Sequence, residues 1–120
     1  MKKILIVEDD KDMQEVYRSF FEDEKEKYEI AVMDDATDAL TVLKDGGYDL
    51  VVLDIIMEPM TGDSFFVYAK DDIKTMNIPI IIVSVLSQDI MTNLNHIGKF
   101  EYLQKPISKE QLINKIEDLI

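Results

Sequence analysis

Short apolar runs alternate with amphipathic stretches along the 120-residue chain, and this alternation constrains the fold more than any other feature. Runs that are apolar on both faces indicate strands buried within a sheet. The three clearest are Ile4 to Val7, Asp49 to Leu53 after its first residue, and Ile78 to Val85. Tyr28 to Met33 and Phe100 to Gln104 are weaker candidates flanked by charge, which suits strands at the edges of a sheet.

The stretches between these runs carry apolar residues at helical spacing, with charged residues opposite them. The five apolar stripes comprise Met13, Val16, Tyr17, Phe20 and Phe21; Ala39, Leu40 and Leu43; Phe65, Phe66, Ala69 and Ile73; Ile90, Met91, Leu94 and Ile97; and Leu112, Ile116 and Leu119. Gly46 and Gly47 end the second helix, and Ser108 with Gln111 has capping-box spacing before the last. The order βαβαβαβαβα predicts an α/β fold, a doubly wound five-stranded parallel sheet of order 2-1-3-4-5 with helices on both faces.

Composition and charge exclude several classes of function. Hydrophobic residues make up 47% of the chain, enough for a core, and 13 basic against 25 acidic residues give a formal net charge of −12. This charge repels phosphate backbones and anionic lipid, so direct nucleic-acid or membrane binding is not expected. The absence of cysteine, with His96 as the one histidine, excludes thiolate and His/Cys zinc sites. Because no apolar segment is long enough for a signal peptide or a membrane span, a cytoplasmic protein is expected.

Acidic and polar residues stand where the predicted strands end. Glu8 and Asp9 follow the first strand and Asp54 follows the third; Ser84 lies near the end of the fourth, and Lys105 follows the fifth. In a sheet of this order ligands bind at the carboxyl ends of the strands, at the switch point between the first and the third. The fourth and fifth strands bring Ser84 and Lys105 to the same edge. Oxygen ligands favour a hard cation such as Mg²⁺, which binds carboxylates together with waters and a phosphate. The pattern therefore predicts Mg²⁺ beside a phosphoryl group, whose oxygens Lys105 and the Ser84 hydroxyl would contact.

Ordinary structural roles are also open to most of these residues. The acids after the first strand can cap the next helix, and Ser84 can be a hydrogen-bonded core hydroxyl. Lys105 can be a turn residue, since the residue before proline avoids the α region. Asp54 is harder to explain in this way because it ends a very apolar strand and precedes three more apolar residues. The argument for a site is that all of these residues meet at one edge.

Four motifs carry a resemblance to a known family. The segments ILIVEDD, DLVVLDIIM with MTG at 60 to 62, PIIIVS and YLQKPI resemble those of the receiver domains of two-component response regulators, over essentially the whole chain. The resemblance implies a flavodoxin-like fold and a single receiver domain over residues 1–120, with no output domain in the chain. It also implies a signalling function that phosphorylation switches on and off.

The resemblance further implies where the phosphoryl group and the metal bind. Asp54 would be the phosphoacceptor. Glu8, Asp9 and Asp54 would hold Mg²⁺, or Mn²⁺ in its place, and the Ile56 backbone carbonyl would be a further ligand. The donor would be a sensor histidine kinase or a phosphotransfer protein. No enzymatic activity is expected beyond self-directed phosphotransfer and autodephosphorylation.

The same resemblance implies how the domain would signal. Ser84 and Lys105 would bind the phosphoryl group, and Tyr102 would rotate inward on activation. The surface of the fourth helix, fifth strand and fifth helix would then change and control a downstream effector or an output domain. This face is also the candidate surface for a dimer. The family's Lys-Pro bond is usually cis, and Lys105-Pro106 is compatible with that.

The chain departs from the family's pattern at several positions. After the phosphoacceptor it has the segment 57–60, Met-Glu-Pro-Met, in which the proline comes one place late. Val85 and Lys99 stand where the family usually has small residues, and a side chain as large as that of Val85 would narrow the access to Asp54. By the same resemblance, Ile56 and Leu86 stand at the two variable positions that tune dephosphorylation in this family. Neither side chain can orient an attacking water, so slow hydrolysis of the phosphoryl group is predicted.

Two other classes of function remain as alternatives. A pseudo-receiver would keep the fold and signal by contact without phosphorylation, but such proteins usually lose one or more of the site residues that this chain retains. An enzyme on the same scaffold would bind a flavin or a nucleotide or hydrolyse phosphate esters. The chain lacks a glycine-rich loop after the first strand, and Asp54 lacks a second acid two residues on.

Overall fold

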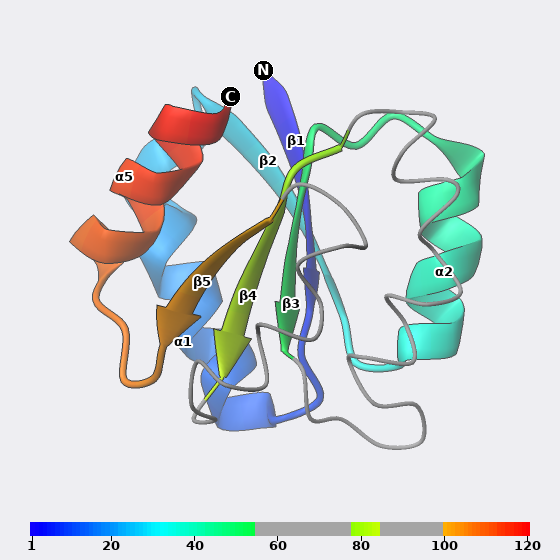
Figure 1. Cartoon of the computed structure of the whole chain (residues 1–120), viewed down its shortest axis with the longest axis horizontal. Helices are drawn as coiled ribbons and strands as arrows, with labels where there is room; N and C mark the ends of the chain where they lie inside the picture. Colours follow the sequence, from blue (N-terminus) through cyan, green and yellow to red (C-terminus); the bar gives the residue numbers. More distant parts are fainter. Residues whose placement is uncertain (55–77, 85–99) are drawn as a thin grey trace.

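One parallel sheet organises the part of the chain that the computed structural model describes, residues 1–54, 78–84 and 100–120. Its strands are β1 (Lys2–Val7), β2 (Tyr28–Met33), β3 (Leu50–Asp54), β4 (Ile80–Ser84) and β5 (Phe100–Gln104). They lie in the order β2-β1-β3-β4-β5, and every neighbouring pair is parallel (Figure 1). The predicted fold class and strand order are confirmed, with β2 and β5 at the edges of the sheet.

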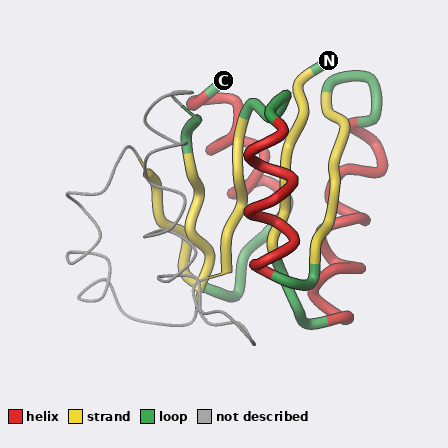
Figure 2. The backbone as a smooth tube through the Cα atoms, turned by 90° about the vertical axis from the view of Figure 1, so that its right-hand side faces the viewer, coloured by secondary structure: helices red, strands yellow, loops and turns green. Residues whose placement is uncertain are grey.

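Helices cover both faces of this sheet. They are α1 (Lys11–Phe21), a short 3₁₀ turn η1 (Glu22–Glu24), α2 (Ala36–Asp45) and α5 (Lys109–Leu119). Helices α1 and α5 lie on one face and α2 lies on the other (Figure 1); Figure 2, seen from the α2 side, shows α2 in front of the strands. The helices predicted around Phe65 to Ile73 and Ile90 to Ile97 lie outside the described residues.

The strands divide their side chains between two cores, as strands buried on both sides require. In β1, Leu5 and Val7 belong to the core under α2, whereas Ile4 and Ile6 belong to the core under α1 and α5. All four side chains are at most 1% exposed. This two-sided burial is the reason that β1, β3 and β4 read as unbroken apolar runs in the sequence.

Three strand bounds differ from the predicted ones. Strand β1 begins at Lys2 rather than Ile4, because backbone pairing continues past the apolar run: the Lys2 amide donates to the Lys27 carbonyl at 3.0 Å. Strand β3 includes Asp54, which pairs in register with Val83. Strand β4 begins at Ile80 rather than Ile78, since Pro79 has no N–H to donate.

The buried face of α1 is also rotated from the predicted stripe. Tyr17 and Phe21 are buried as expected, but Val16 is 37% exposed. Gln14, which the apolar pattern passes over, is only 4% exposed. Gln14, Tyr17 and Phe21 are spaced by three and four residues, so they share one face of the helix.

The predicted helix signals are confirmed. Gly46 ends α2 with φ of 84°, a positive value that glycine adopts without strain. At the start of α5, the Gln111 amide donates to Ser108 Oγ at 3.1 Å and the Ser108 amide donates to Gln111 Oε1 at 2.9 Å. Within the described ranges, the helices are too short or too polar to cross a membrane.

Candidate functional site

The register of the sheet brings the predicted site residues to one edge. Val7 pairs with Leu53, so Glu8 and Asp54 are the next positions on neighbouring strands. On the far side of β3, Asp54 pairs with Val83, and Ser84 pairs with Gln104 immediately before Lys105. The backbone thus places Glu8, Asp54, Ser84 and Lys105 along the carboxyl ends of four adjacent strands, as the sequence predicted.

Glu8 is the buried charge of this edge. Its side chain is 1% exposed, and its Oε2 lies 3.7 Å from Lys105 Nζ, whose side chain is 21% exposed. A carboxylate buried this deeply needs compensating charge, and Lys105 provides it from the end of β5. The Lys105-Pro106 peptide bond is cis. Two residues from opposite ends of the chain therefore form one charged pair at the predicted site.

The three acids after β1 have separate roles. Asp10 is exposed and caps α1, since its Oδ1 accepts a hydrogen bond from the Asp12 amide at 3.0 Å. Glu8 Oε1 accepts from the Asp10 amide at 3.3 Å. Asp9, between them, is half-buried. The capping interpretation is thus correct for Asp10, whereas Glu8 is turned into the molecule.

Of the remaining predicted residues, the structure describes some in full, some by their backbone alone, and some not at all. Tyr102 is half-buried and packs against the core under α2. For Asp54 and Ser84 the structure describes the backbone, and their side chains lie outside the description. Ile56, Leu86, Val85 and the segment 57–60 also lie outside the described residues, so their predicted roles are not tested.

One residue that contributes to this edge was not predicted. Gln14 of α1 is buried, and its side-chain Nε2 donates to the Glu8 backbone carbonyl at 2.6 Å. The sequence contains a signal for it, because Gln14 precedes Tyr17 and Phe21 at helical spacing on the buried face of α1. A search restricted to apolar residues overlooks a polar side chain at such a position.

The donor chemistry of the edge suits a hard cation. Glu8 and Asp9 offer carboxylate oxygens, the ligands that Mg²⁺ prefers. In residues 1–54, 78–84 and 100–120 no group of three or more His, Cys, Asp or Glu side chains gathers for a metal ion. The predicted ligand set also contains Asp54 and Ile56, however, and their ligand atoms are outside the description.

Comparison with known families decides which family the chain belongs to. The model of the response regulator receiver domain family matches residues 4–117, nearly the whole chain. The chain belongs to this family. Its receiver domain is also similar to known regulators and to solved receiver structures.

Two curated relatives show the extent of that similarity. The nisin biosynthesis regulatory protein NisR of Lactococcus lactis is 34% identical over 117 residues, which are 96% of this chain and 48% of NisR. The response regulator SaeR of Staphylococcus epidermidis is 29% identical over 122 residues, 100% of this chain and 51% of SaeR. The chain therefore spans about half the length of the curated relatives it matches.

Two solved structures agree closely with the receiver domain. The receiver domain of the Francisella response regulator 1452 superposes with a TM-score of 0.86 at 28% identity, covering 99% of this chain and 96% of that one. The response regulator TrrA of Thermotoga maritima, in complex with Mg²⁺-BeF, gives a TM-score of 0.83 at 28% identity over the full length of both chains.

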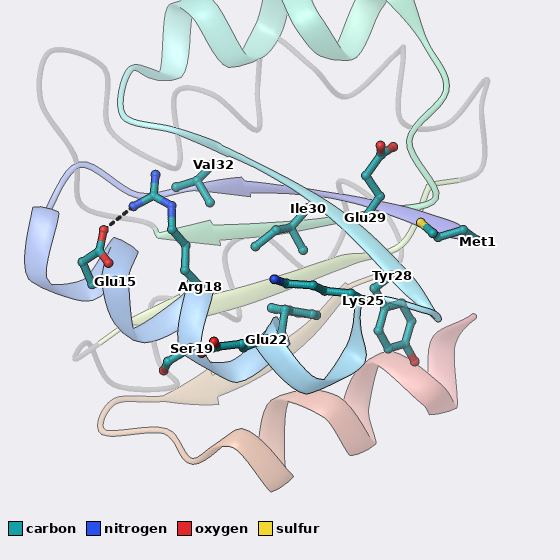
Figure 3. A pocket seen from close by; sticks show the side chains of 11 residues that line it. Met1, Glu15, Arg18, Ser19, Glu22, Lys25, Tyr28, Glu29, Ile30 and Val32 are labelled. Atoms are coloured by element: carbon teal, nitrogen blue, oxygen red, sulfur yellow. Dashed lines mark hydrogen bonds and ion pairs between the residues drawn. The ribbon is translucent and has the colours of Figure 1, made fainter.

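A hollow of about 730 Å³ lies away from the acidic edge, between α1, η1 and the edge strand β2 (Figure 3). It is lined by apolar β2 side chains and by charges of both signs, and Arg18 bonds Glu15 within it at 2.7 Å. Of the predicted site residues that the structure describes, none lines it. The hollow is therefore separate from the candidate site.

Proposed function

We propose that this receiver domain accepts a phosphoryl group on Asp54, in the presence of Mg²⁺, from a histidine kinase or a phosphotransfer protein. The observation that carries the proposal is the Glu8–Lys105 pair, in which a 1% exposed carboxylate lies 3.7 Å from the lysine Nζ. Val7 and Leu53 pair in register, so Glu8 and the backbone of Asp54 are next to each other at the ends of neighbouring strands. Family membership adds that phosphorylation-switched signalling is the role of such domains. A buried charge pair with no ligand to serve would add little stability.

The transfer is a displacement at phosphorus. A carboxylate oxygen of Asp54 forms the new P–O bond, and the P–N bond of the donor's phosphohistidine breaks, leaving its electron pair on the imidazole nitrogen. Negative charge gathers on the phosphoryl oxygens during this step. Lys105, whose Nζ lies 3.7 Å from Glu8 Oε2 at this edge, would offset part of that charge, and the Ser84 hydroxyl would donate a hydrogen bond to one of these oxygens.

Glu8 and Asp9 would hold the metal together with Asp54 and the Ile56 carbonyl. Bound Mg²⁺ would neutralise charge on the carboxylates and on the phosphoryl group. The complex of TrrA with Mg²⁺-BeF supports a metal and a phosphoryl-like group in this fold. Lys105, which pairs with Glu8 over 3.7 Å, would present its ammonium group to the phosphoryl oxygens from the end of β5.

The phosphoryl group would change the partner surface. Ser84 would move toward it, and Tyr102, half-buried against the core under α2, would move inward into the space that this frees. These movements would shift the equilibrium between two conformations of the surface that includes β5 and α5, and an effector or an output domain would bind one of the two conformations in preference. A dimer through this surface is part of the same proposal.

Mass spectrometry tests the proposal directly. We expect the wild-type domain, incubated with Mg²⁺ and acetyl phosphate, to gain the mass of one phosphoryl group, and hydroxylamine to remove it, because the product is an acyl phosphate. The Asp54→Asn variant should gain nothing. Asp45→Asn, the same change at an exposed residue at the end of α2, is the matched control and should behave like the wild type.

The alternative is a pseudo-receiver that signals without phosphorylation. It would be favoured if the wild type gained no mass from acetyl phosphate or from a cognate kinase. A gain that persisted in Asp54→Asn would instead show that another residue is the phosphoacceptor.

A further inference from the structure

Gln14 stands out because a buried amide needs a reason. Its side chain is 4% exposed on the core-facing side of α1, where its neighbours on the same face are Tyr17 and Phe21. An apolar side chain there would pack with less cost, since a buried amide must recover its lost hydration through hydrogen bonds. Gln14 makes such a bond: its Nε2 donates to the Glu8 backbone carbonyl at 2.6 Å.

This bond completes the restraint of Glu8. The Glu8 amide donates to the Met33 carbonyl of β2 at 2.9 Å, and the Glu8 carbonyl accepts from Gln14. Both backbone groups of the residue are therefore fixed, one by the neighbouring strand and one by a helix side chain. The carbonyl belongs to the peptide unit that joins Glu8 to Asp9, so Gln14 also restrains the orientation from which Asp9 projects.

We propose that Gln14 is a positioning residue, which holds the Glu8-Asp9 peptide so that both carboxylates are preorganised for the divalent cation. The inference rests on the proposed function of the edge and names a residue that the predicted ligand set does not contain. Removing a group that orients metal ligands typically lowers metal affinity about ten- to a hundredfold. Gln14 acts through the backbone rather than through a ligand side chain, so the lower end of that range is expected.

Isothermal titration with Mg²⁺ alone tests this role. We expect Gln14→Met, which keeps the length of the side chain and removes its donor, to weaken Mg²⁺ binding about tenfold. The matched control is Phe21→Leu, two turns along the same buried face and 2% exposed. It should lower stability by loss of packing and leave the Mg²⁺ dissociation constant within about twofold of the wild type. A purely structural role for Gln14 predicts that both variants leave Mg²⁺ affinity unchanged.

A second readout needs no variant. We expect the side-chain NH₂ signals of Gln14 in the wild-type NMR spectrum to shift on saturation with Mg²⁺, because the peptide that they bond carries both acids. The inference is overturned if wild-type protein binds Mg²⁺ while these signals stay in place, or if Gln14→Met binds Mg²⁺ as tightly as the wild type. A wild type that binds no Mg²⁺ would instead overturn the proposed function and this inference together.

Discussion

Lys105 illustrates how much a residue's surroundings decide what its charge does. Its ion pair with Glu8 and the ion pair of Lys109 with Asp23 have the same separation of 3.7 Å. The Glu8 side chain is 1% exposed, whereas that of Asp23 is 87% exposed. Water screens the second pair and leaves it worth little, but removing Lys105 would leave a buried carboxylate without its neighbouring cation.

Lys105→Met is therefore expected to lower the free energy of unfolding by about 2 kcal/mol when a chelator keeps the protein free of divalent cations. This cost is smaller than that of breaking a fully buried ion pair, because the Lys105 side chain is 21% exposed. Lys109→Met should cost less than about 0.5 kcal/mol. Urea unfolding followed by circular dichroism measures both. Equal costs for the two variants would contradict the assignment of Lys105 as the compensating charge. Saturating Mg²⁺ should recover part of the loss in Lys105→Met, since a cation at the proposed site would supply positive charge beside Glu8.

The start of α5 and the buried face of α1 show which features of a helix can be predicted from neighbouring residues in the sequence. The capping box of α5 was predicted from the spacing of Ser108 and Gln111 alone, and both of its hydrogen bonds are present. The reason is that these bonds depend only on residues within one turn. The burial of α1 depends on what packs against it, and here the apolar pattern placed Val16 inside and overlooked Gln14.

Ser108→Ala is expected to lower the free energy of unfolding by about 1 kcal/mol, because the Gln111 amide loses its acceptor at the start of α5. Asn114→Ala, an exposed change within the same helix, is the control and should stay within about 0.5 kcal/mol of the wild type. Chemical denaturation of the three proteins side by side gives the comparison. A cost for Ser108→Ala no greater than that for Asn114→Ala would show that the cap contributes nothing.

At the level of the whole molecule, the arrangement of the sheet was more predictable than the contacts at its edge. Alternation of strands and helices allows few parallel topologies, and two-sided burial marks β1, β3 and β4 as central strands. The site residues follow from that order because each stands next to a strand end. The Glu8–Lys105 pairing and the Gln14 bond were not predicted, since they depend on side-chain orientation and the apolar pattern carries no information about it.

The chain has a net charge of −12, so added salt can stabilise it in two ways, by screening charge repulsion and by binding of a cation at a site. Sodium chloride should stabilise the domain by screening the repulsion among its 25 acidic residues. Mg²⁺ at matched ionic strength should stabilise it further, by about 2.7 kcal/mol at a hundredfold excess over its dissociation constant, because the proposed metal site would form only in the folded state. Thermal and urea unfolding in the two salts measure the difference.

The Asp9→Asn variant distinguishes the site from the overall charge. It should keep the response to sodium chloride, since one acid among 25 changes the overall repulsion little. It should lose most of the additional stabilisation by Mg²⁺, because the variant lacks one of the predicted carboxylate ligands. Equal additional stabilisation of wild type and Asp9→Asn by Mg²⁺ would mean that Asp9 is not a ligand. No stabilisation of the wild type beyond that given by sodium chloride would mean that the cation acts only by screening charge.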